Sequence, residues 1–294
     1  MIIDLSTLNG LDKQHYLQHV IAPRPICFAS TVNRDGVVNL SPFSFFNLFS
    51  TNPPVVIFSP SRRVRNNTIK HTLENVWEVP EVAINIVDYA MVQQTSLASC
   101  EYERGINEFQ KAGFTMQPSS IIKPPMVKES KAKMECRVLE VKTLGSEGGA
   151  GNLVICEVLL LHLDDSILDA NKRVDQKKIS HVARLGGNWY CKVDEQNLFE
   201  VPKPNVQLGI GVDALPASVK NSSILSGNDL GILANVTSIP QKDAAFRDDY
   251  QELLKAKTPV STAVELLHLY AKKMIVEGAV DKAWQIALAA DSLL

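Results

Sequence analysis

The sequence predicts a mainly β domain built on an antiparallel sheet with short helices, followed by a C-terminal α-helical extension. Three observations support this fold class. Short apolar or alternating segments separated by turn residues fill residues 21–193, a glycine-rich turn at 145–152 joins two long strand-like segments, and helical patterns prevail after residue 229. Pro202 and Pro204 mark a linker where the composition changes. We therefore expect two domains, residues 1–204 and 205–294.

The composition is that of an ordinary globular protein and argues against several classes of function. Of 294 residues, 45% are hydrophobic and 21% charged, and the net charge of −2 provides no long-range attraction to nucleic acid or an anionic membrane. The N-terminus lacks a secretory pattern, and no segment reaches the roughly 20 apolar residues of a membrane span. Five cysteines without a Cys-x-x-Cys pair predict neither a disulfide framework nor a metal site. A cytoplasmic location is the expectation.

The first elements are predicted from apolar runs and turn chemistry. Residues 1–20 have the pattern of a short surface helix, and His15 and His19 lie one turn apart on it without completing a metal-site motif. Residues 26–32 form an uncharged run that predicts a buried strand, and a turn ending at Gly36 returns residues 37–40 antiparallel. Pro42 is expected to interrupt the regular ladder.

The segment after this hairpin has the features of a ligand cradle. Residues 41–47 read SPFSFFN, which places three aromatic rings among two hydroxyls and an amide, and backbone amides beside Pro42 are expected to be free. A strand is predicted at 54–58. The loop at 59–68 then carries three arginines just before a helix predicted at 69–76, which is typical of a phosphate site. The two segments together predict a planar, phosphorylated cofactor.

The rest of the first domain is predicted to alternate strands and short helices. Strands are expected at 81–87, 132–144 and 153–163, a helix at 89–100, a helix and loop at 101–111, and an extended excursion at 113–126. The glycines of the 145–152 turn are interpreted as a hairpin turn, because a strand follows them and no phosphate-loop lysine is present.

The extension after residue 205 is predicted to be helical at 230–236, 244–256, 260–276 and 280–293. In the third of these helices, Thr262 and Glu265 have the spacing of a capping box and Gly278 marks the end. The sequence Gly209-Ile210-Gly211 lacks the βαβ context of a dinucleotide site. The role of the extension is left open between packing on the first domain, lengthening a dimer interface and binding a partner.

An ordered set of motifs in residues 21–193 resembles the flavin reductase-like family with the FMN-binding split-barrel fold. The motifs are Pro23-Arg24-Pro25, Ser30-Thr31, Asp35-Gly36, the NLSPFSFF run at 39–46, Asn67-Thr68, Asn107-Glu108-Phe109, Glu135-Cys136 and the RLGGNWY run at 184–190. Many relatives carry Lys-Asp before the threonine, whereas this chain has Asn66 and Asn67. Arg62, Arg63 or Arg65 can supply the missing positive charge.

The resemblance implies an antiparallel, Greek-key-like split β-barrel that forms homodimers and binds FMN near the interface. It assigns no catalytic residue and no metal. Arg184 is either a flavin contact at the subunit boundary or an exposed ion-pairing residue. The cofactor-binding residues that the motifs and their chemistry indicate are Thr31, Asn39, Leu40, Ser41, Pro42, Ser44, Phe45, Phe46, Ser59, Arg62, Asn66, Asn67, Thr68 and Arg184.

The function implied is that of an FMN-dependent oxidoreductase. NADH or NADPH is the expected electron donor, and free flavin, a partner oxygenase or another molecule is the acceptor. The alternative is a protein that binds FMN, or another flat ligand such as haem, without turnover. A hydrolase is not supported, because no Gly-x-Ser-x-Gly elbow is present.

Overall fold

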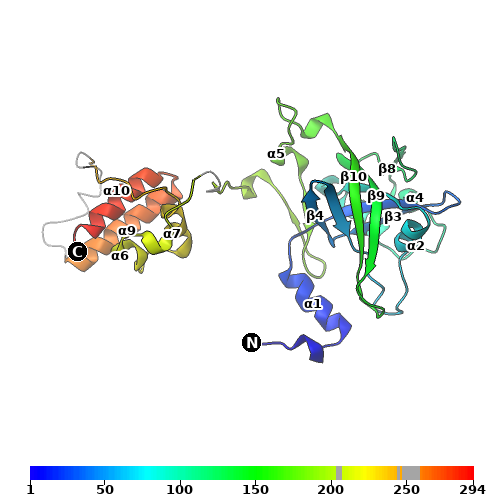
Figure 1. Ribbon diagram of the computed structural model, residues 1–294, viewed down its shortest axis with the longest axis horizontal. Coiled ribbons are helices and arrows are strands. Elements are labelled where there is room, and N and C mark those ends of the chain that lie inside the picture. Colours follow the sequence, from blue (N-terminus) through cyan, green and yellow to red (C-terminus); the bar gives the residue numbers. More distant parts are fainter. Residues whose placement is uncertain (203–206, 244–245, 247–258) are drawn as a thin grey trace. The chain divides into compact units, whose positions relative to one another are not determined.

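A computed structural model describes residues 1–202, 207–243, 246 and 259–294, and these form two compact units, Met1–Leu198 and Phe199–Leu294 (Figure 1). The helix predicted at 244–256 lies outside the described residues except for Phe246. Among the described segments, no helix combines the length and the apolar character required to cross a membrane.

The first unit is built on a seven-stranded antiparallel sheet with the strand order β3-β2-β6-β9-β10-β5-β4. All of its strands except β4, which the sequence analysis did not predict, confirm those predicted to within three residues at each end. They are β2 (Cys27–Val32), β3 (Val38–Phe43), β4 (Phe46–Thr51), β5 (Pro54–Phe58), β6 (Glu81–Ile86), β9 (Ala132–Thr143) and β10 (Asn152–Leu163).

Two small sheets and several short helices complete the first unit. The strands are β1 (Arg24–Pro25), β11 (Val182–Arg184) and β12 (Tyr190–Lys192) in one sheet, and β7 (Met116–Gln117) and β8 (Met126–Val127) in the other. The helices are α1 (Gly10–Val20), α2 (His71–Glu78), α3 (Val92–Ala98), α4 (Glu108–Ala112) and α5 (Gln176–Ile179), with 3-10 turns η1 (Leu5–Thr7), η2 (Tyr89–Met91), η3 (Asp165–Ile167) and η4 (Glu195–Asn197). Figure 1 shows α2 and α4 beside the β3 edge of the main sheet.

The main sheet curls around one apolar core. Strands from both ends of the strand order contribute to it, and the rings of Phe43 on β3 and Phe58 on β5 lie 5.1 Å apart between centroids. A second core on the other face of β2 and β3 is covered by α3 and α4, with Phe28 and Phe109 fully buried. In the described part of the chain β3 and β4 each pair on one side only, so both are edge strands.

The strand β3 does not stop at Pro42, as the sequence analysis expected, but continues to Phe43. Pro42 is the register partner of Phe28 on β2. The N–H of Leu40 points away from β2, because it donates to Glu108 Oε2 at 2.9 Å. Residue 42 has the same orientation two positions later, so its missing N–H removes no sheet hydrogen bond. An edge position therefore tolerates the proline.

The extended excursion after residue 113 is anchored by the buried carboxylate of Glu135 on β9. Glu135 accepts backbone N–H groups from Ser120 at 2.7 Å, Ile121 at 2.7 Å and Ile122 at 3.2 Å, and His162 Nε2 lies 2.7 Å from Oε1. Burial raises the pKa of Glu135, but these hydrogen bonds together lower it by more, so its pKa lies below the usual range.

The second unit is a helical cluster around Trp284, whose indole N–H donates to Leu233 O at 3.1 Å. Its described helices are α6 (Ala217–Lys220), α7 (Gly227–Leu233), α9 (Val260–Val276) and α10 (Val280–Asp291), with the 3-10 turn η5 (Val212–Ala214). Gly278, with φ of +77°, follows the end of α9 as predicted. The capping box predicted at Thr262 and Glu265 is wrong, because α9 already begins at Val260; Ser226 and Asp229 form such a box at α7.

We expect Glu135→Gln to destabilise the first unit by about 1–3 kcal/mol at neutral pH, because a charged acceptor of several amides is lost. A carboxyl whose folded pKa is lowered stabilises the fold above its unfolded pKa, and this contribution is lost as the pH falls. The difference between the two proteins should therefore shrink below about pH 4.3. Urea denaturation of the wild type and Glu135→Gln, at neutral pH and below about pH 4.3, measures this difference in the free energy of unfolding. Glu140→Gln, at an exposed position of the same strand, is the control and should change little; a pH-independent difference would contradict the carboxylate's role.

Candidate functional site

Two predicted cofactor residues hold α2 against the β2–β3 hairpin. Thr31 and Asn39 are register partners, and both are buried. The Asn39 amide donates to Thr72 Oγ1 at 2.9 Å, and the Asn75 amide donates to Thr31 Oγ1 at 3.1 Å. Thr31 therefore acts as a support for α2. Asn39 does the same and also lines a depression described below.

The loop at 59–68 is a compact turn organised by its arginines. Arg62 donates from Nε to Asn67 Oδ1 at 2.6 Å and from Nη2 to Asn67 O at 2.7 Å, and Asn67 has a left-handed φ of 54°. Arg63 Nη1 donates to Thr68 Oγ1 at 2.9 Å, and the Thr68 hydroxyl donates to Asn66 Oδ1 at 2.9 Å. The predicted phosphate-site residues of this loop thus lie together.

The glycine-rich hairpin tip supports this arginine loop from outside. Arg62 N–H donates to Ala150 O at 2.8 Å, and the Asn152 amide donates to Pro60 O at 2.9 Å. A Cβ on Gly148 would lie only 2.9 Å from a backbone oxygen of the loop. The predicted hairpin turn therefore also shapes the arginine loop.

The three arginines differ in their ion pairing. Arg63 Nε lies 3.3 Å and Arg65 Nη2 lies 3.1 Å from the carboxylate of Glu101. Within the described part of the chain, no carboxylate lies in ion-pair distance of Arg62. Arg62 is therefore the arginine of this loop with an uncompensated charge.

A depression of about 500 Å³ opens beside these arginines, lined by Arg62, Arg63, Thr68, Ile69, His71 and Glu74. His71 is the first residue of α2, whose N-terminus carries no side-chain cap. Burial lowers the pKa of His71, Glu74 raises it, and Arg63, Arg104 and Lys70 lower it further, so the imidazole is neutral near pH 7. Free helix amides and an unpaired guanidinium both favour an anion here.

A second, more enclosed depression shares Arg63 and His71 with the first and reaches the β3 edge. Its other polar lining residues are Asn39, Ser41, Lys70, Thr72, Ser99, Glu101, Tyr102 and Glu108. Burial and the charge of Arg63 lower the pKa of Lys70. Burial raises the pKa of Glu108, although the Leu40 amide and Lys70 oppose this shift. The two depressions together form one polar surface, lined by the cations Arg62, Arg63 and Lys70 and by the carboxylates Glu74, Glu101 and Glu108.

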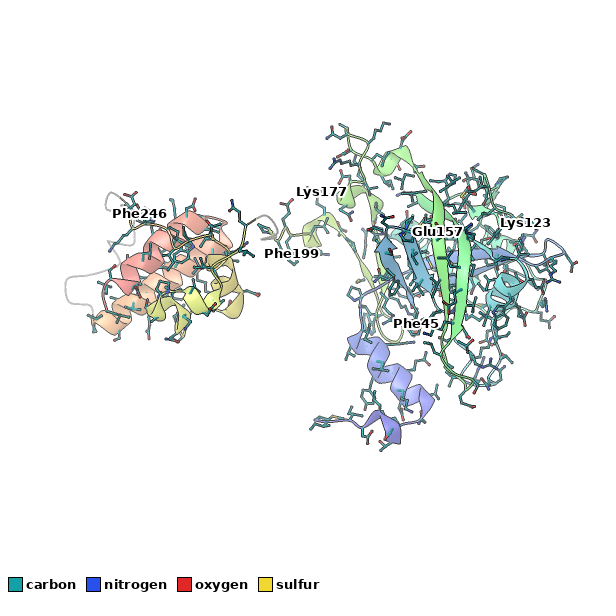
Figure 2. The ribbon with its side chains drawn as sticks, viewed as in Figure 1. Phe45, Lys123, Glu157, Lys177, Phe199 and Phe246 are labelled. Carbon is teal, nitrogen blue, oxygen red and sulfur yellow. The ribbon has the colours of Figure 1, made fainter. Side chains whose placement is uncertain are left out.

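The aromatic segment 41–46 borders this surface but is less open than predicted. Phe43 is buried in the core, and the Leu40 side chain is fully buried with its N–H already bonded to Glu108. Ser41, Pro42, Ser44 and Phe46 are half-buried. Phe45, labelled in Figure 2, keeps 42% of its surface exposed, and its carbonyl accepts the Ser59 N–H at 2.8 Å.

Arg184 is not among the residues that line these depressions. It lies on β11 as the register partner of Arg24 on β1, and it lines a different depression together with Tyr190. Arg24 lies 5.9 Å from the ring centroid of Phe45, so β1 separates Arg184 from the aromatic segment.

Sequence reasoning missed Lys70, His71 and Glu108 as site residues. Lys70 and His71 directly follow the predicted loop, and the signal was the placement of two titratable residues at the start of a helix. Glu108 belongs to a motif of the resemblance, but its position beside Leu40 depends on tertiary structure. No group of three or more histidine, cysteine or acidic side chains able to hold a metal occurs within the residues that the structure describes.

The comparisons with known proteins agree with this architecture. Residues 20–178 match the flavin reductase like domain, and the helical unit lies outside that match. An uncharacterized protein from Aquifex aeolicus is 36% identical over 173 residues, which cover 59% of this chain and 86% of that protein.

Two solved structures resemble the first unit. Nitrilotriacetate monooxygenase component B from Bacillus cereus is 28% identical with a TM-score of 0.64, and the match covers 68% of this chain and 98% of that one. A protein with a split barrel domain from Shewanella frigidimarina is 25% identical with a TM-score of 0.59, covering 69% of this chain and 99% of that one.

We expect Glu108→Ala to lower the free energy of unfolding by about 1–3 kcal/mol, because the buried Leu40 amide loses its acceptor. Glu108→Gln keeps an acceptor for this amide and should lower the free energy of unfolding by less. Since burial raises the pKa of Glu108, protonation favours the folded state, and the stability of the wild type relative to Glu108→Gln should rise as the pH falls through that pKa. Denaturant titrations across pH 4 to 8 test this; the opposite slope would contradict the raised pKa.

Proposed function

The chain belongs to the flavin reductase-like family, and from this premise we propose that it is an FMN-dependent oxidoreductase. NADH or NADPH is the proposed electron donor. The acceptor is free flavin, a partner oxygenase or another small molecule. Similarity to component B of a monooxygenase from Bacillus cereus supports the partner oxygenase among these acceptors.

One observation carries this proposal: an unpaired guanidinium and an uncapped helix N-terminus line the same depression. Arg62 has no carboxylate partner among the described residues, and α2 begins at His71 without a side-chain cap. Both features favour the phosphate of a cofactor.

The side chains in and beside the two depressions have the chemical groups that FMN binding requires: cations for the phosphate and hydroxyl groups for the ring. Arg62, Arg63, Thr68 and the first amides of α2 would hold the phosphate, and Ser41 and Ser44 would donate to polar ring atoms beside the exposed ring of Phe45. When bound, FMN supplies the electron-transfer chemistry. Glu108 holds the β3 edge through Leu40, and Lys70 keeps positive charge close to it, so both residues position the binding surface.

A homodimer with the cofactor near the interface is part of this proposal. The edge strand β4 exposes Leu48 by 57% and Phe49 by 64%, and α1 has no buried residue while Leu11 is 62% exposed. Large exposed apolar side chains at a sheet edge are typical of a surface that another chain covers.

The first test is Arg62→Ala, which should weaken FMN affinity by about tenfold or more, because one charge-assisted contact is lost. The measurement is quenching of FMN fluorescence during titration. Arg65→Ala is the matched control: Arg65 is a neighbouring, mostly exposed arginine that already pairs with Glu101, so its loss should change the affinity little. Equal effects of both substitutions would indicate a general charge effect, and no effect of Arg62→Ala would move the anchor to Arg63, which lines the same depression.

The second test separates turnover from mere binding. The protein loaded with FMN should lose its visible flavin absorption under anaerobic conditions when NADH or NADPH is added. Flavin that stays oxidised with an excess of both nucleotides, yet is reduced by dithionite, would establish the alternative of a non-catalytic flavin-binding protein.

A further inference from the structure

One wall of the enclosed depression at the β3 edge is the segment 99–107, which joins α3 to α4. Its residues 99–102 line this depression together with Ser41. Its residues 104–106 line a neighbouring depression, and His71 takes part in both. The segment is therefore part of the boundary of the polar surface on which the proposed function rests.

The depression behind this segment is too small for a ligand of the size of a cofactor. Its free volume is about 20 Å³. This is room for about one water molecule, whereas small-molecule sites enclose about 300–1,000 Å³. Ser41, which the proposed function places beside the flavin ring, lines this small space. A ring can therefore reach Ser41 from this side only after the segment 99–107 has moved.

The segment 99–107 is attached to the polar surface by side chains and not by its backbone. None of its residues is buried. Its backbone hydrogen bonds go to α3, to α4 or to the segment itself, and among the described residues none goes to the arginine loop or to α2. A segment without buried side chains and with few backbone hydrogen bonds opens at a low cost in free energy. These are the physical properties of a lid.

Ion pairs hold this segment in place at two points. At the first, the carboxylate of Glu101 pairs with two arginines of the 59–68 loop, as described above. At the second, Arg104 Nη1 lies 3.5 Å from Glu74 and Arg104 Nη2 lies 3.6 Å from Glu78, both on α2. The side chains of Glu101 and Arg104 are about half exposed, so water and salt weaken both attachments.

Glu101 takes the place that the anionic group of a ligand would occupy. Its carboxylate contacts Arg63, which the proposed function assigns to the phosphate. Burial and the charge of Arg63 lower the pKa of Lys70, whereas the charges of Glu101 and Glu108 raise it, so the Glu101 carboxylate also acts on a second cation of the depression. A phosphate group carries up to two negative charges and three acceptor oxygens, and it can therefore replace a single carboxylate at these cations.

We propose that residues 99–107 are a lid over the polar surface and that Glu101 is an internal anion, which the phosphate group of the ligand displaces from Arg63. The identity of this ligand as FMN rests on the proposed function. With Glu101 in place, Arg63 is partly neutralised and the space beside Ser41 is closed. Displacement of Glu101 releases the lid and opens that space to the planar part of the same molecule. The site therefore selects a ligand that has both an anionic group and a ring.

The experiment follows FMN binding to the full-length protein by stopped-flow fluorescence quenching, which gives the association rate constant and the affinity. Glu101→Gln should raise both by about threefold or more, because the first attachment of the lid is lost. Arg104→Gln removes a positive charge, yet it should also raise the association rate constant by about twofold to threefold, because the second attachment is lost. A purely electrostatic effect on an anionic ligand would have opposite signs in these two variants.

A matched control and a second probe accompany this measurement. Glu103 is an exposed carboxylate of the same segment without an ion-pair partner among the described residues, so Glu103→Gln should leave the association rate constant unchanged. Inorganic phosphate, titrated by calorimetry, tests the displacement of Glu101 without a flavin. Glu101→Gln should bind inorganic phosphate about threefold more tightly than the wild type does.

The possible outcomes separate the lid from the proposed function. Faster FMN association in both Glu101→Gln and Arg104→Gln supports the lid, whether or not NADH or NADPH reduces the loaded protein. Unchanged or weaker binding in Glu101→Gln overturns it, because Glu101 would then position the arginines or have no effect on the ligand. Slower association in Arg104→Gln, or equal gains in Glu101→Gln and Glu103→Gln, overturns it as well, because charge alone would explain the result. Tighter binding of inorganic phosphate by Glu101→Gln in a protein that does not bind FMN would contradict the proposed function and still support Glu101 as the internal anion.

Discussion

The open edge of β3 is the constraint on which the candidate site depends. A strand with one neighbour must find partners outside the sheet for half of its backbone groups and for its polar side chains. Glu108 accepts the outward amide of Leu40, Thr72 accepts from Asn39, and Pro42 has no amide to satisfy. These contacts bring α4 and α2 to the same edge, and α2 carries Lys70 and His71 there with its uncapped N-terminus.

The electrostatic balance of the first unit follows from the way these helices are attached. Glu101 neutralises part of the charge of Arg63 and Arg65, and Glu108 is used by the backbone of β3. Arg62 and Lys70 are left without carboxylates in ion-pair distance among the described residues. The cations and carboxylates that line the two depressions are equal in number, so anion binding there depends on the local position of Arg62 and not on a net positive charge of the pocket.

Most strands and the arginine loop could be predicted from the sequence, because two-residue alternation, turn glycines and clustered arginines are local signals. The continuation of β3 through Pro42 could not, since nothing local shows that a strand lies at an edge. The role of Glu108 could not be predicted for the same reason, because Glu108 contacts Leu40 only through the tertiary packing of α4 on β3. Thr262 and Glu265 have the spacing of a cap, yet the preceding Pro259 starts the helix earlier. The sequence left Arg184 open between a flavin contact and an exposed ion-pairing residue, because its place beside Arg24 depends on the register of β11 with β1.

The support of the arginine loop by the tip of the long hairpin has a consequence for the order of folding. Arg62 is held by Ala150, and Pro60 by Asn152, a partner 92 positions later in the chain. Closing so long a loop costs chain entropy before any contact is gained. During synthesis, the loop therefore acquires its final shape only after the strands β9 and β10 have emerged and paired, and the anion-binding surface is among the last parts of this unit to mature.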